Sequence, residues 1–285
     1  MNSIVLKDIQ YKYPLAENYA LDGIDLTFEK GKLYGVIGPN GGGKTTLCCL
    51  IKGLIPDFYY GDLTGSVEIE GRSVSEWDKS ELCTKVGYVF QNPFTQISGI
   101  RDTVLEEIVI GLENMGVPKE KMIKRAISVA NRINIYDLLE KNPNELSGGQ
   151  RQRVAFASIL AMDADIYVID EPTSQLDPDG TESVFRIIRS LKEEKKTIIL
   201  VEHKIELMAE YADELIVMKD GKVLKNGPTK EVLSDPSLLR QKVEVPQTVL
   251  FSRAMEEAGK PLAGIPVTID EAERYARERM AHNEH

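Results

Sequence analysis

A glycine-rich stretch near the N-terminus has the spacing of a phosphate-binding loop. Residues 38–46 read GPNGGGKTT and directly follow the apolar run LYGVI. Glycines allow successive backbone N–H groups to curl around phosphate oxygens at a helix start, the lysine reaches the terminal phosphates, and the next hydroxyl holds Mg²⁺. A chance glycine-rich turn is the alternative. The stretch predicts a nucleotide site with Thr45 as a metal ligand, formed by Asn40, Gly41, Gly42, Gly43, Lys44, Thr45 and Thr46.

Two acids at the end of a later apolar strand could complete a hydrolytic site. In IYVIDEP (166–172), Asp170 would present a carboxylate to the metal at the edge of a sheet. The adjacent Glu171 could polarise a water molecule for attack on the terminal phosphate. The alternative is a strand end with two solvated acids. The phosphate loop favours the hydrolytic interpretation, since both motifs would end neighbouring strands.

A second helix start suited to anions lies about a hundred residues further on, in LSGGQRQR (146–153). Ser147 is a good N-cap, and Gly148 and Gly149 leave backbone donors open to an anion. Glycines lower helix stability, so a pair at this position indicates that something approaches the backbone closely. An ordinary serine-capped helix is the alternative.

Composition restricts the classes of partner. The chain of 285 residues has a net charge of −10, which argues against general nucleic-acid binding. Its three cysteines are Cys48, Cys49 and Cys83, and they form no CxxC motif. We therefore expect neither a disulfide framework nor a zinc site, and we expect the protein to reside in a reducing cytosol. No apolar run approaches the roughly 18 residues of a membrane span, and the N-terminus lacks the apolar core of a signal peptide. Any membrane role is therefore expected to come through partners.

Strand-like and helix-like segments alternate along most of the chain. Residues 3–13 and 21–28 alternate apolar and polar positions, as antiparallel strands do, whereas 33–38 is mostly apolar, as a buried strand is. We expect an α/β fold with a mainly parallel sheet, an antiparallel β lobe near the N-terminus and a helical insert at about 92–160. The predicted domains are residues 1–235 and a small C-terminal α/β extension, 236–285.

The order of the motifs resembles that of ATP-binding-cassette (ABC) ATPases. The phosphate loop is followed by VFQNP, LSGGQ, IYVIDEP, SQLD and VEH, and the resemblance covers about residues 3–234. It implies a P-loop NTPase fold and hydrolysis of ATP with Mg²⁺. In ABC ATPases two cassettes associate head to tail, and the LSGGQ helix of one covers the γ-phosphate bound by the other. The residues implied to act in trans are Ser147, Gly148, Gly149, Gln150 and Asp177.

The resemblance also implies catalytic roles. Gln91, in VFQNP, would contact Mg²⁺ and the attacking water, and His203, in VEH, would hydrogen-bond the γ-phosphate. Together with Glu171 these would be the catalytic residues. The implied metal ligands are Thr45, Gln91 and Asp170.

Two further positions remain open within this resemblance. Tyr13, which precedes Pro14, would be the aromatic platform for adenine, although Tyr11 is a rival and a tyrosine in a strand is often simply packed. Gln175 stands where the family usually has a small residue, which leaves the geometry around Asp177 uncertain.

The stretch after Gln91 resembles the cassette subunits of energy-coupling-factor importers, which take up vitamins and transition metals. QNPFTQISGIRDTVLEEIVIGLENMGVP carries their glutamine after QNP (Gln96), the TV-x-E helix start and the G-x-E-N-x-G helix end. An amphipathic helix with a glycine stop is the alternative. The resemblance implies a peripheral location on the cytoplasmic face of the cell membrane. The implied partners are a second cassette (identical or related), a transmembrane scaffold and a small substrate-binding membrane protein, with no nucleic acid.

Apolar residues in that stretch could form the contact with the scaffold. Phe94, Ile97 and Ile100 lie in a polar loop that contains glycine, and we expect them at the rim of a groove for helices of the scaffold. The alternative is that they pack beneath their own loop.

Other classes of P-loop protein fit the sequence less well. Cassette proteins of translation usually carry two cassettes, and this chain has one LSGGQ. DNA-repair cassettes need a long coiled-coil insertion, yet 54 residues separate Gln91 from Leu146. GTPases use Asn-Lys-x-Asp, and no asparagine here precedes a lysine. The alternative that remains is a soluble ABC ATPase, or a cassette of another transporter class.

The tail after residue 235 is punctuated by prolines. Pro236, Pro246, Pro261 and Pro266 make one continuous helix improbable, and Thr268 predicts a helix start with a capping box. Fifty residues with so few apolar positions can hardly form a core alone. We expect a module that helps to hold two cassettes together, and a solvated tail is the alternative.

Overall fold

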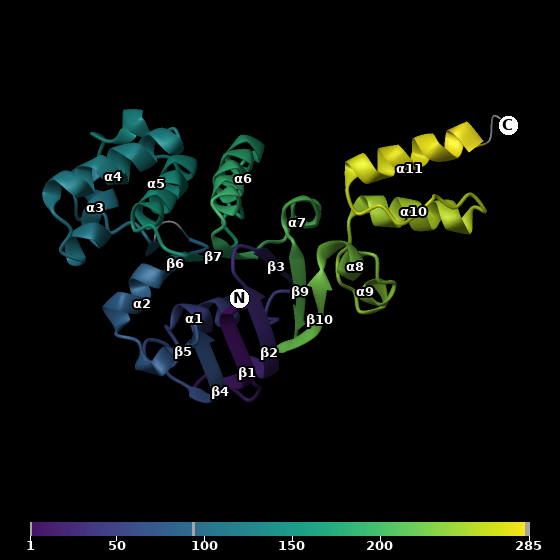
Figure 1. Ribbon diagram of the computed structural model, residues 1–285, viewed down its shortest axis with the longest axis horizontal. Helices are drawn as coiled ribbons and strands as arrows, with labels where there is room; N and C mark the ends of the chain where they lie inside the picture. Colours follow the sequence, from purple (N-terminus) through teal and green to yellow (C-terminus); the bar gives the residue numbers. More distant parts are fainter. Residues whose placement is uncertain (1, 93–94, 283–285) are drawn as a thin grey trace.

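Two β-sheets form the centre of the fold in the computed structural model, which describes residues 2–92 and 95–282 (Figure 1). The smaller sheet is antiparallel, with the order β2-β1-β4-β5. Its strands are β1 (Asn2–Lys12), β2 (Leu21–Glu29), β4 (Asp62–Ile69) and β5 (Arg72–Ser73). This sheet confirms the antiparallel lobe expected near the N-terminus.

The larger sheet is parallel except at one edge and has the order β10-β9-β3-β8-β7-β6. Its strands are β3 (Leu33–Ile37), β6 (Val86–Val89), β7 (Ile166–Asp170), β8 (Thr197–Val201), β9 (Glu214–Lys219) and the antiparallel β10 (Lys222–Pro228). Strands β3, β7 and β8 are buried at every position, which explains their almost uninterrupted apolar sequences. In the register, Val201 is level with both Val36 and Asp170, so these strands end side by side.

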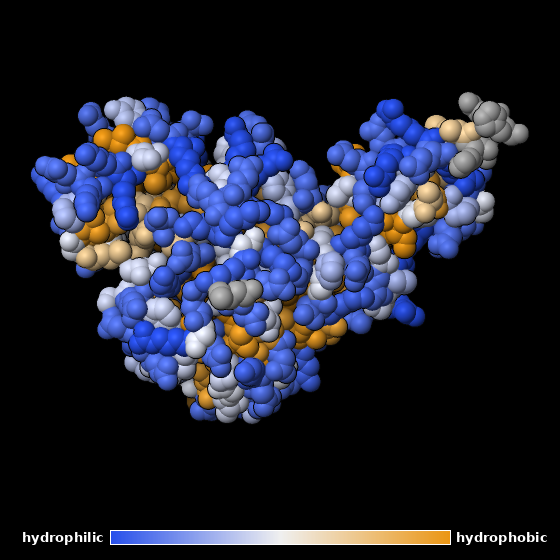
Figure 2. Space-filling view, viewed as in Figure 1, coloured by the Kyte–Doolittle hydropathy of each residue, from blue (hydrophilic) through white to orange (hydrophobic). Residues whose placement is uncertain are grey.

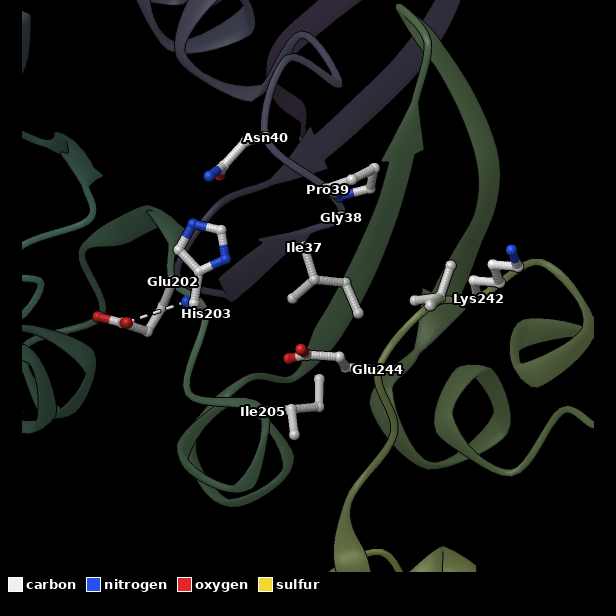
Figure 3. A pocket seen from close by; sticks show the side chains of 10 residues that line it. Ile37, Gly38, Pro39, Asn40, Glu202, His203, Ile205, Lys242 and Glu244 are labelled. Atoms are coloured by element: carbon white, nitrogen blue, oxygen red, sulfur yellow. Dashed lines mark hydrogen bonds between the residues drawn. The ribbon is translucent and has the colours of Figure 1, made fainter.

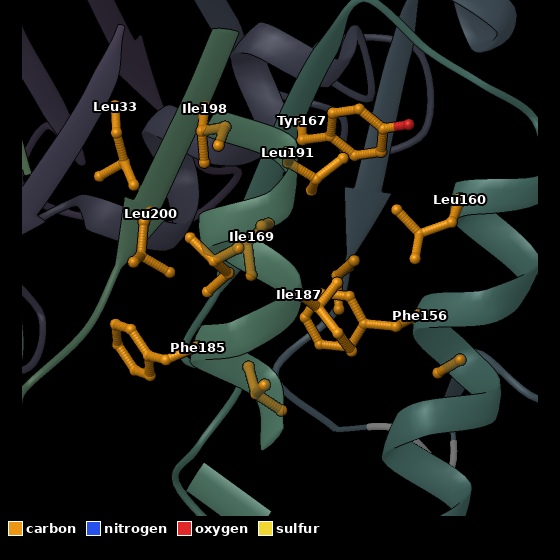
Figure 4. Close-up of a cluster of buried hydrophobic side chains, with 14 of the residues drawn as sticks. Leu33, Phe156, Leu160, Tyr167, Ile169, Phe185, Ile187, Leu191, Ile198 and Leu200 are labelled. Atoms are coloured by element: carbon orange, nitrogen blue, oxygen red, sulfur yellow. The ribbon is translucent and has the colours of Figure 1, made fainter. Parts of the chain in front are cut away.

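Successive side chains of the parallel strands enter two different cores. Tyr34, Val36 and Val168 face helix α1 (Lys44–Lys52) and the antiparallel sheet. Leu33 and Ile169 face the opposite side, where helices cover the sheet. Figure 4 shows this second core, with Phe156 and Phe185 packed against the strands. The strand period of two therefore explains why both faces of the sheet need cover.

The expected helical insert is present and divided as its sequence predicts. A capping box between Thr103 and Glu106 starts α3 (Val104–Asn114), and Gly116 and Pro118 separate it from α4 (Lys119–Arg132). Helix α5 (Gly148–Ala161) packs on α3 and leads back to the sheet. The remaining elements before residue 229 are α2 (Lys79–Lys85), α6 (Pro178–Glu193), α7 (Ile205–Tyr211) and the 3₁₀ turns η1 (Val74–Glu76), η3 (Tyr136–Leu138) and η4 (Pro143–Glu145).

The C-terminal extension is helical, so the expected α/β character of this part is wrong. Its helices are α9 (Ser237–Arg240), α10 (Gln247–Glu257) and α11 (Ile269–His282), after α8 (Thr229–Leu233), and the described residues 236–282 contain no strand. Prolines separate these helices as predicted, because a proline cannot continue a helix ladder. Residues 243–246 lie in neither a helix nor a strand, and the segments on either side of them are helical. Thr268 caps α11 as expected, accepting a hydrogen bond from Glu271 N at 3.3 Å.

The extension is joined to the cassette by apolar packing. Leu238 and Val249 are fully buried, and Val243, Val245 and Val267 are nearly so, all in the core that covers the parallel sheet. In Figure 1, α10 and α11 project beside the body, in yellow. The boundary at residue 235 stays a prediction, since the core continues across it. Within the described residues, no helix is both long enough and apolar enough to span a bilayer.

Candidate nucleotide-binding site

The sequence-predicted site residues follow the carboxyl ends of four parallel strands. The phosphate loop (38–46) follows β3, Gln91 follows β6, Glu171 follows β7 and His203 follows β8. Because these ends lie at one edge of the sheet, the loops meet there, where ligands of open α/β sheets bind. A cleft of about 440 Å³ opens at this edge, lined by Tyr13, Ala20, Asn40, Gly41, Gly43, Lys44, Thr45, Thr46, Gln91 and Glu171.

The phosphate loop has a backbone that only glycine allows at its first position. Gly38 has φ +140°, and a Cβ atom there would lie 1.9 Å from the carbonyl oxygen of Met218. At the far end of the loop, Gly43 is the N-cap of α1 and supplies no side chain to its first turn. The N–H groups of that turn therefore stay available for an anion at the positive end of the helix.

Lys44 is held within the loop although it carries a charge. Its side chain is 5% exposed, and its ammonium group donates to the carbonyl oxygens of Gly38 and Pro39 at 2.9 and 3.1 Å. Burial lowers the pKa of Lys44, while the carboxylates of Glu171 and Asp170 raise it. This cation faces the cleft where phosphate charge would be matched.

The oxygens near Asp170 fit Mg²⁺. Asp170 is 1% exposed, and its Oδ1 atom is buried with no hydrogen-bond partner among the described residues. Burial raises the pKa of Asp170, the Glu171 carboxylate raises it further, and hydrogen bonds from Thr45 and Tyr88 lower it. A buried, uncompensated carboxylate oxygen beside a hydroxyl is a ligand set that a hard cation satisfies. Thr45, Gln91 and Asp170 would hold the ion, which would supply positive charge to the phosphates.

Tyr88 is a contact that sequence analysis missed. Its hydroxyl donates to Asp170 Oδ2 at 3.4 Å from β6, the neighbouring strand. Burial strongly raises the pKa of Tyr88, so the phenol remains a donor. This bond orients the carboxylate through Oδ2 and leaves Oδ1 as the oxygen without a hydrogen-bond partner among the described residues. All four positions of β6 are buried, so the strand's pattern gave no sign that this tyrosine differs from a core residue.

Glu171 contacts two predicted catalytic residues whose motifs lie far apart in the sequence. Gln91 Nε2 donates to Glu171 Oε2 at 2.7 Å, and His203 Nε2 lies 2.9 Å from Glu171 Oε1. Glu171 also has φ +44°, a left-handed backbone that is uncommon for a residue with a side chain and that often marks functional sites. The three predicted catalytic side chains therefore form one connected group beside the phosphate loop.

The structure also separates the two candidate adenine platforms. Tyr13 lines the cleft, and its hydroxyl lies 3.2 Å from Thr46 Oγ1 on the first turn of α1. Tyr11 is fully buried and packs edge-on against Tyr13, with ring centroids 4.8 Å apart. Tyr13 is thus the ring that an adenine could reach. Ala20, which also lines the cleft, had no signal in the sequence.

The signature segment, residues 146–150, forms a second hollow of about 500 Å³. Ser147 Oγ accepts from Gln150 N at 3.3 Å while Ser147 N donates to Gln150 Oε1 at 3.0 Å, which confirms the predicted cap. A Cβ at Gly148 would meet nothing within 4 Å, so this chain's own packing does not require glycine there. The hollow is lined by Ser147, Gly148, Gly149, Gln150, Arg153, Gln175, Leu176, Asp177, Asp179, Gly180 and Ser183.

Asp177 has a local role in this hollow. Its Oδ1 accepts from Gly180 N at 2.7 Å and caps α6. Gln175 lies beside it, lining the same surface.

The C-terminal segment reaches the site from the other side. His203 and the loop residues Pro39 and Asn40 line a pocket of about 270 Å³ together with Lys242 and Glu244 (Figure 3). In this view the Glu244 side chain points into the space below His203. Lys242 and Glu244 were not predicted, because nothing in a short polar stretch identifies what it will face.

Comparison with known proteins agrees with this geometry. The family model described as ABC transporter matches residues 21–174, more than half of the chain. The chain belongs to the ABC transporter family. It is therefore an ATP-binding cassette, and it hydrolyses ATP in a reaction coupled to transport.

Individual relatives support the same assignment. The cassette is 41% identical over 261 residues to a putative ABC transporter ATP-binding protein of Pyrococcus abyssi, covering 91% of this chain and 92% of the relative. It is 39% identical over 263 residues to the energy-coupling factor transporter ATP-binding protein EcfA1 of Bacillus subtilis, covering 91% and 90%. This confirms the resemblance to energy-coupling-factor cassettes.

One solved structure of similar fold contains bound nucleotide. A dimeric ATP-binding cassette in a post-hydrolysis state, bound to ADP and Pi, superposes with a TM-score of 0.69 at 29% identity. The match covers 79% of this chain and 98% of that one. The expected P-loop cassette fold is confirmed.

Replacing Glu171 separates chemistry from binding. We expect Glu171→Gln to keep ATP affinity within a few-fold, since the phosphate loop is intact, while turnover falls about 10²-fold or more through loss of the proton acceptor. Lys44→Ala should instead weaken ATP binding itself. Isothermal titration and phosphate release measure the two effects, and equal turnover of wild type and Glu171→Gln in a preparation free of other ATPases would contradict the role of Glu171.

Proposed function

We propose that ATP binds between two head-to-tail cassettes, each completing the other's site. The observation that carries this proposal is the separation of two surfaces on one chain. The cleft with Lys44 and Glu171 and the hollow with Ser147 and Asp177 share no lining residue. One chain thus presents a phosphate-binding cleft on one surface and a helix N-terminus suited to an anion on another.

Roles in the proposed site follow from the contacts of each residue. Lys44 and the N–H groups of α1 bind the phosphates, and Tyr13 stacks on adenine. Glu171 accepts a proton from the attacking water, and Gln91 and His203, both in contact with its carboxylate, hold it in position. The partner's Ser147 and the N-terminus of its α5 neutralise charge on the γ-phosphate.

We further propose that the cassette powers an energy-coupling-factor importer for a vitamin or a transition metal ion, at the cytoplasmic face of the membrane. The similarity to EcfA1 supports this class. Transport would need a transmembrane scaffold and a small substrate-binding membrane protein as partners. The second cassette would be an identical or a related chain.

Of the three apolar residues expected at the scaffold groove, one is described by the structure and exposed at the surface. Phe94 lies outside the described residues. Ile97 is 7% exposed and packs in the large core, whereas Ile100 is 80% exposed. The proposed contact with the scaffold is therefore centred on Ile100.

The extension offers a surface for a second copy of the chain. Figure 2 shows apolar surface on the extension as well as on the helical insert. The large exposed apolar residues of α10 and α11 are Leu250, Phe251, Ile269 and Met280. We propose that this surface keeps two cassettes together when no nucleotide joins them.

Mixing two inactive variants tests the composite site. Lys44→Ala chains keep their signature segment, and Ser147→Arg chains keep their phosphate loop, so a heterodimer has one intact site while neither homodimer has any. We expect each heterodimer to recover toward half of the wild-type phosphate release, so an equal mixture, in which about half of the dimers are heterodimers, should reach about a quarter. A mixture as inactive as its parents, with subunit exchange demonstrated by a label on one chain, would contradict the two-copy site.

An acidic substitution tests the scaffold contact. Ile100→Asp should abolish copurification with the membrane scaffold, because a charge replaces an apolar contact, while ATP turnover of the isolated cassette stays unchanged. Leu224→Asp on β10, where the leucine is 37% exposed, is the matched control. Retention of scaffold by Ile100→Asp at the level of the control would place the contact elsewhere.

A single substitution on α10 tests the dimer contact without uncovering the core that truncation after Asp235 would expose. Phe251 is 45% exposed. Phe251→Asp should shift the nucleotide-free protein from dimer toward monomer in sedimentation velocity. ATP binding should remain as in wild type, since Phe251 does not line the cleft. If Phe251→Asp and Leu224→Asp sediment alike as dimers, the extension does not hold the cassettes together.

A further inference from the structure

The segment that follows Gln91 is fixed to the fold at residues 96–98. Ile97 is packed in the large core. The N–H and hydroxyl of Ser98 donate to the two carboxylate oxygens of Glu107 on α3, at 2.6 and 2.8 Å. Glu107 is 4% exposed, so this pair is shielded from water. Residues 96–98 are therefore part of the rigid framework around the site.

Gln96 is bonded to the outer edge of β6. Its Oε1 accepts from Phe90 N at 3.2 Å, and its Nε2 donates to Tyr88 O at 3.3 Å. Within residues 2–92 and 95–282, β6 is the last strand of the parallel sheet, so these backbone groups have no further strand there to pair with. The side-chain amide thus takes the place of a neighbouring strand's peptide group.

The same amide reaches the signature helix. Gln96 Nε2 also donates to the carbonyl oxygen of Ala155 on α5, at 3.4 Å. Strand β6 leads to Gln91, which contacts Glu171, and α5 begins at the signature segment. Gln96 therefore joins the strand that serves this chain's own phosphate cleft to the helix that presents the signature segment.

We propose that Gln96 is a positioning residue that fixes the signature helix relative to Gln91 and thereby couples the two ATP sites of a dimer. This rests on the two-copy site proposed above. In each chain, a shift of β6 at one site changes the orientation of α5 at the other, because one amide bonds to both elements and its hydrogen bonds are directional. Gln96 does not line the phosphate cleft, so its effect passes through Gln91 and Ser147.

Heterodimers with one working site test the coupling. Ser147→Arg in the first chain and Lys44→Ala in the second leave a single site, made by the first chain's phosphate loop and the second chain's signature segment. Gln96→Leu, close in volume but unable to make the three bonds, is placed in the first chain or in the second. We expect turnover to fall about 10-fold for either placement, as expected for misplacement of catalytic groups. ATP binding stoichiometry and affinity should not change.

Two further variants make the result specific. Gln96→Glu keeps the acceptor for Phe90 N but cannot donate to Tyr88 O or Ala155 O, so it should reproduce the loss. Gln247→Leu, the same substitution at an exposed residue that begins α10, should leave turnover unchanged in either chain.

The outcomes separate the coupling from the site itself. A fall for only one placement, or for neither, would overturn the proposal, because Gln96 would then serve at most one of the two elements. Loss of ATP binding in step with turnover would also overturn it, since that is loss of folded protein. An inactive parent heterodimer would contradict the two-copy site and the coupling with it, whereas an active parent unaffected by Gln96→Leu contradicts the coupling alone.

Discussion

The shared edge at which β3, β6, β7 and β8 end is the constraint on which the rest of the structure depends. Parallel strands with level ends bring four loops together, although their residues are up to 165 positions apart between Gly38 and His203. The glycine backbone of the phosphate loop and the carboxylate of Glu171, just after β7, then face one cleft. Helices on both faces of the sheet bury the strands that hold this edge in place.

The negative charge at the site explains why ATP binding would require both a metal cation and a second cassette. Asp170 is buried with an uncompensated oxygen, Glu171 lies next to it, and Lys44 is the cation that faces them in the cleft. Phosphates would add negative charge that one buried lysine cannot balance, and Mg²⁺ together with a helix N-terminus could supply the difference. The signature segment offers such an N-terminus, on a surface that its own cleft does not include. In the proposed two-copy site, hydrolysis and association of two copies are therefore one requirement.

Sequence patterns predicted those parts of the site that depend on local order. Glycines before a helix and acids after an apolar strand show which residues lie at the end of an element. The parallel sheet then brings Gln91, Glu171 and His203 together. Tyr88 contacts Asp170 and Glu244 lines the pocket beside His203, and no periodicity in their segments marks either. Gln96 was identified as a motif residue, but its bonds to Tyr88 and Ala155 were not predicted. The α/β expectation for the extension was wrong, because its described residues form three helices and no strand. Ile97 was expected near the scaffold groove, but burial in the core outweighs its position in a loop.

The most direct test of the two-copy site is an experimental structure of the Glu171→Gln variant with Mg²⁺ and ATP. The account predicts two copies in head-to-tail contact, with the backbone N–H groups at Gly148 and Gly149 of one copy and Lys44 of the other within hydrogen-bonding distance, about 3 Å, of the same γ-phosphate. Mg²⁺ should lie against Thr45 and Asp170 of the copy that supplies the lysine. ATP bound to a single copy, or a dimer in which the signature segment faces away from the phosphates, would contradict it.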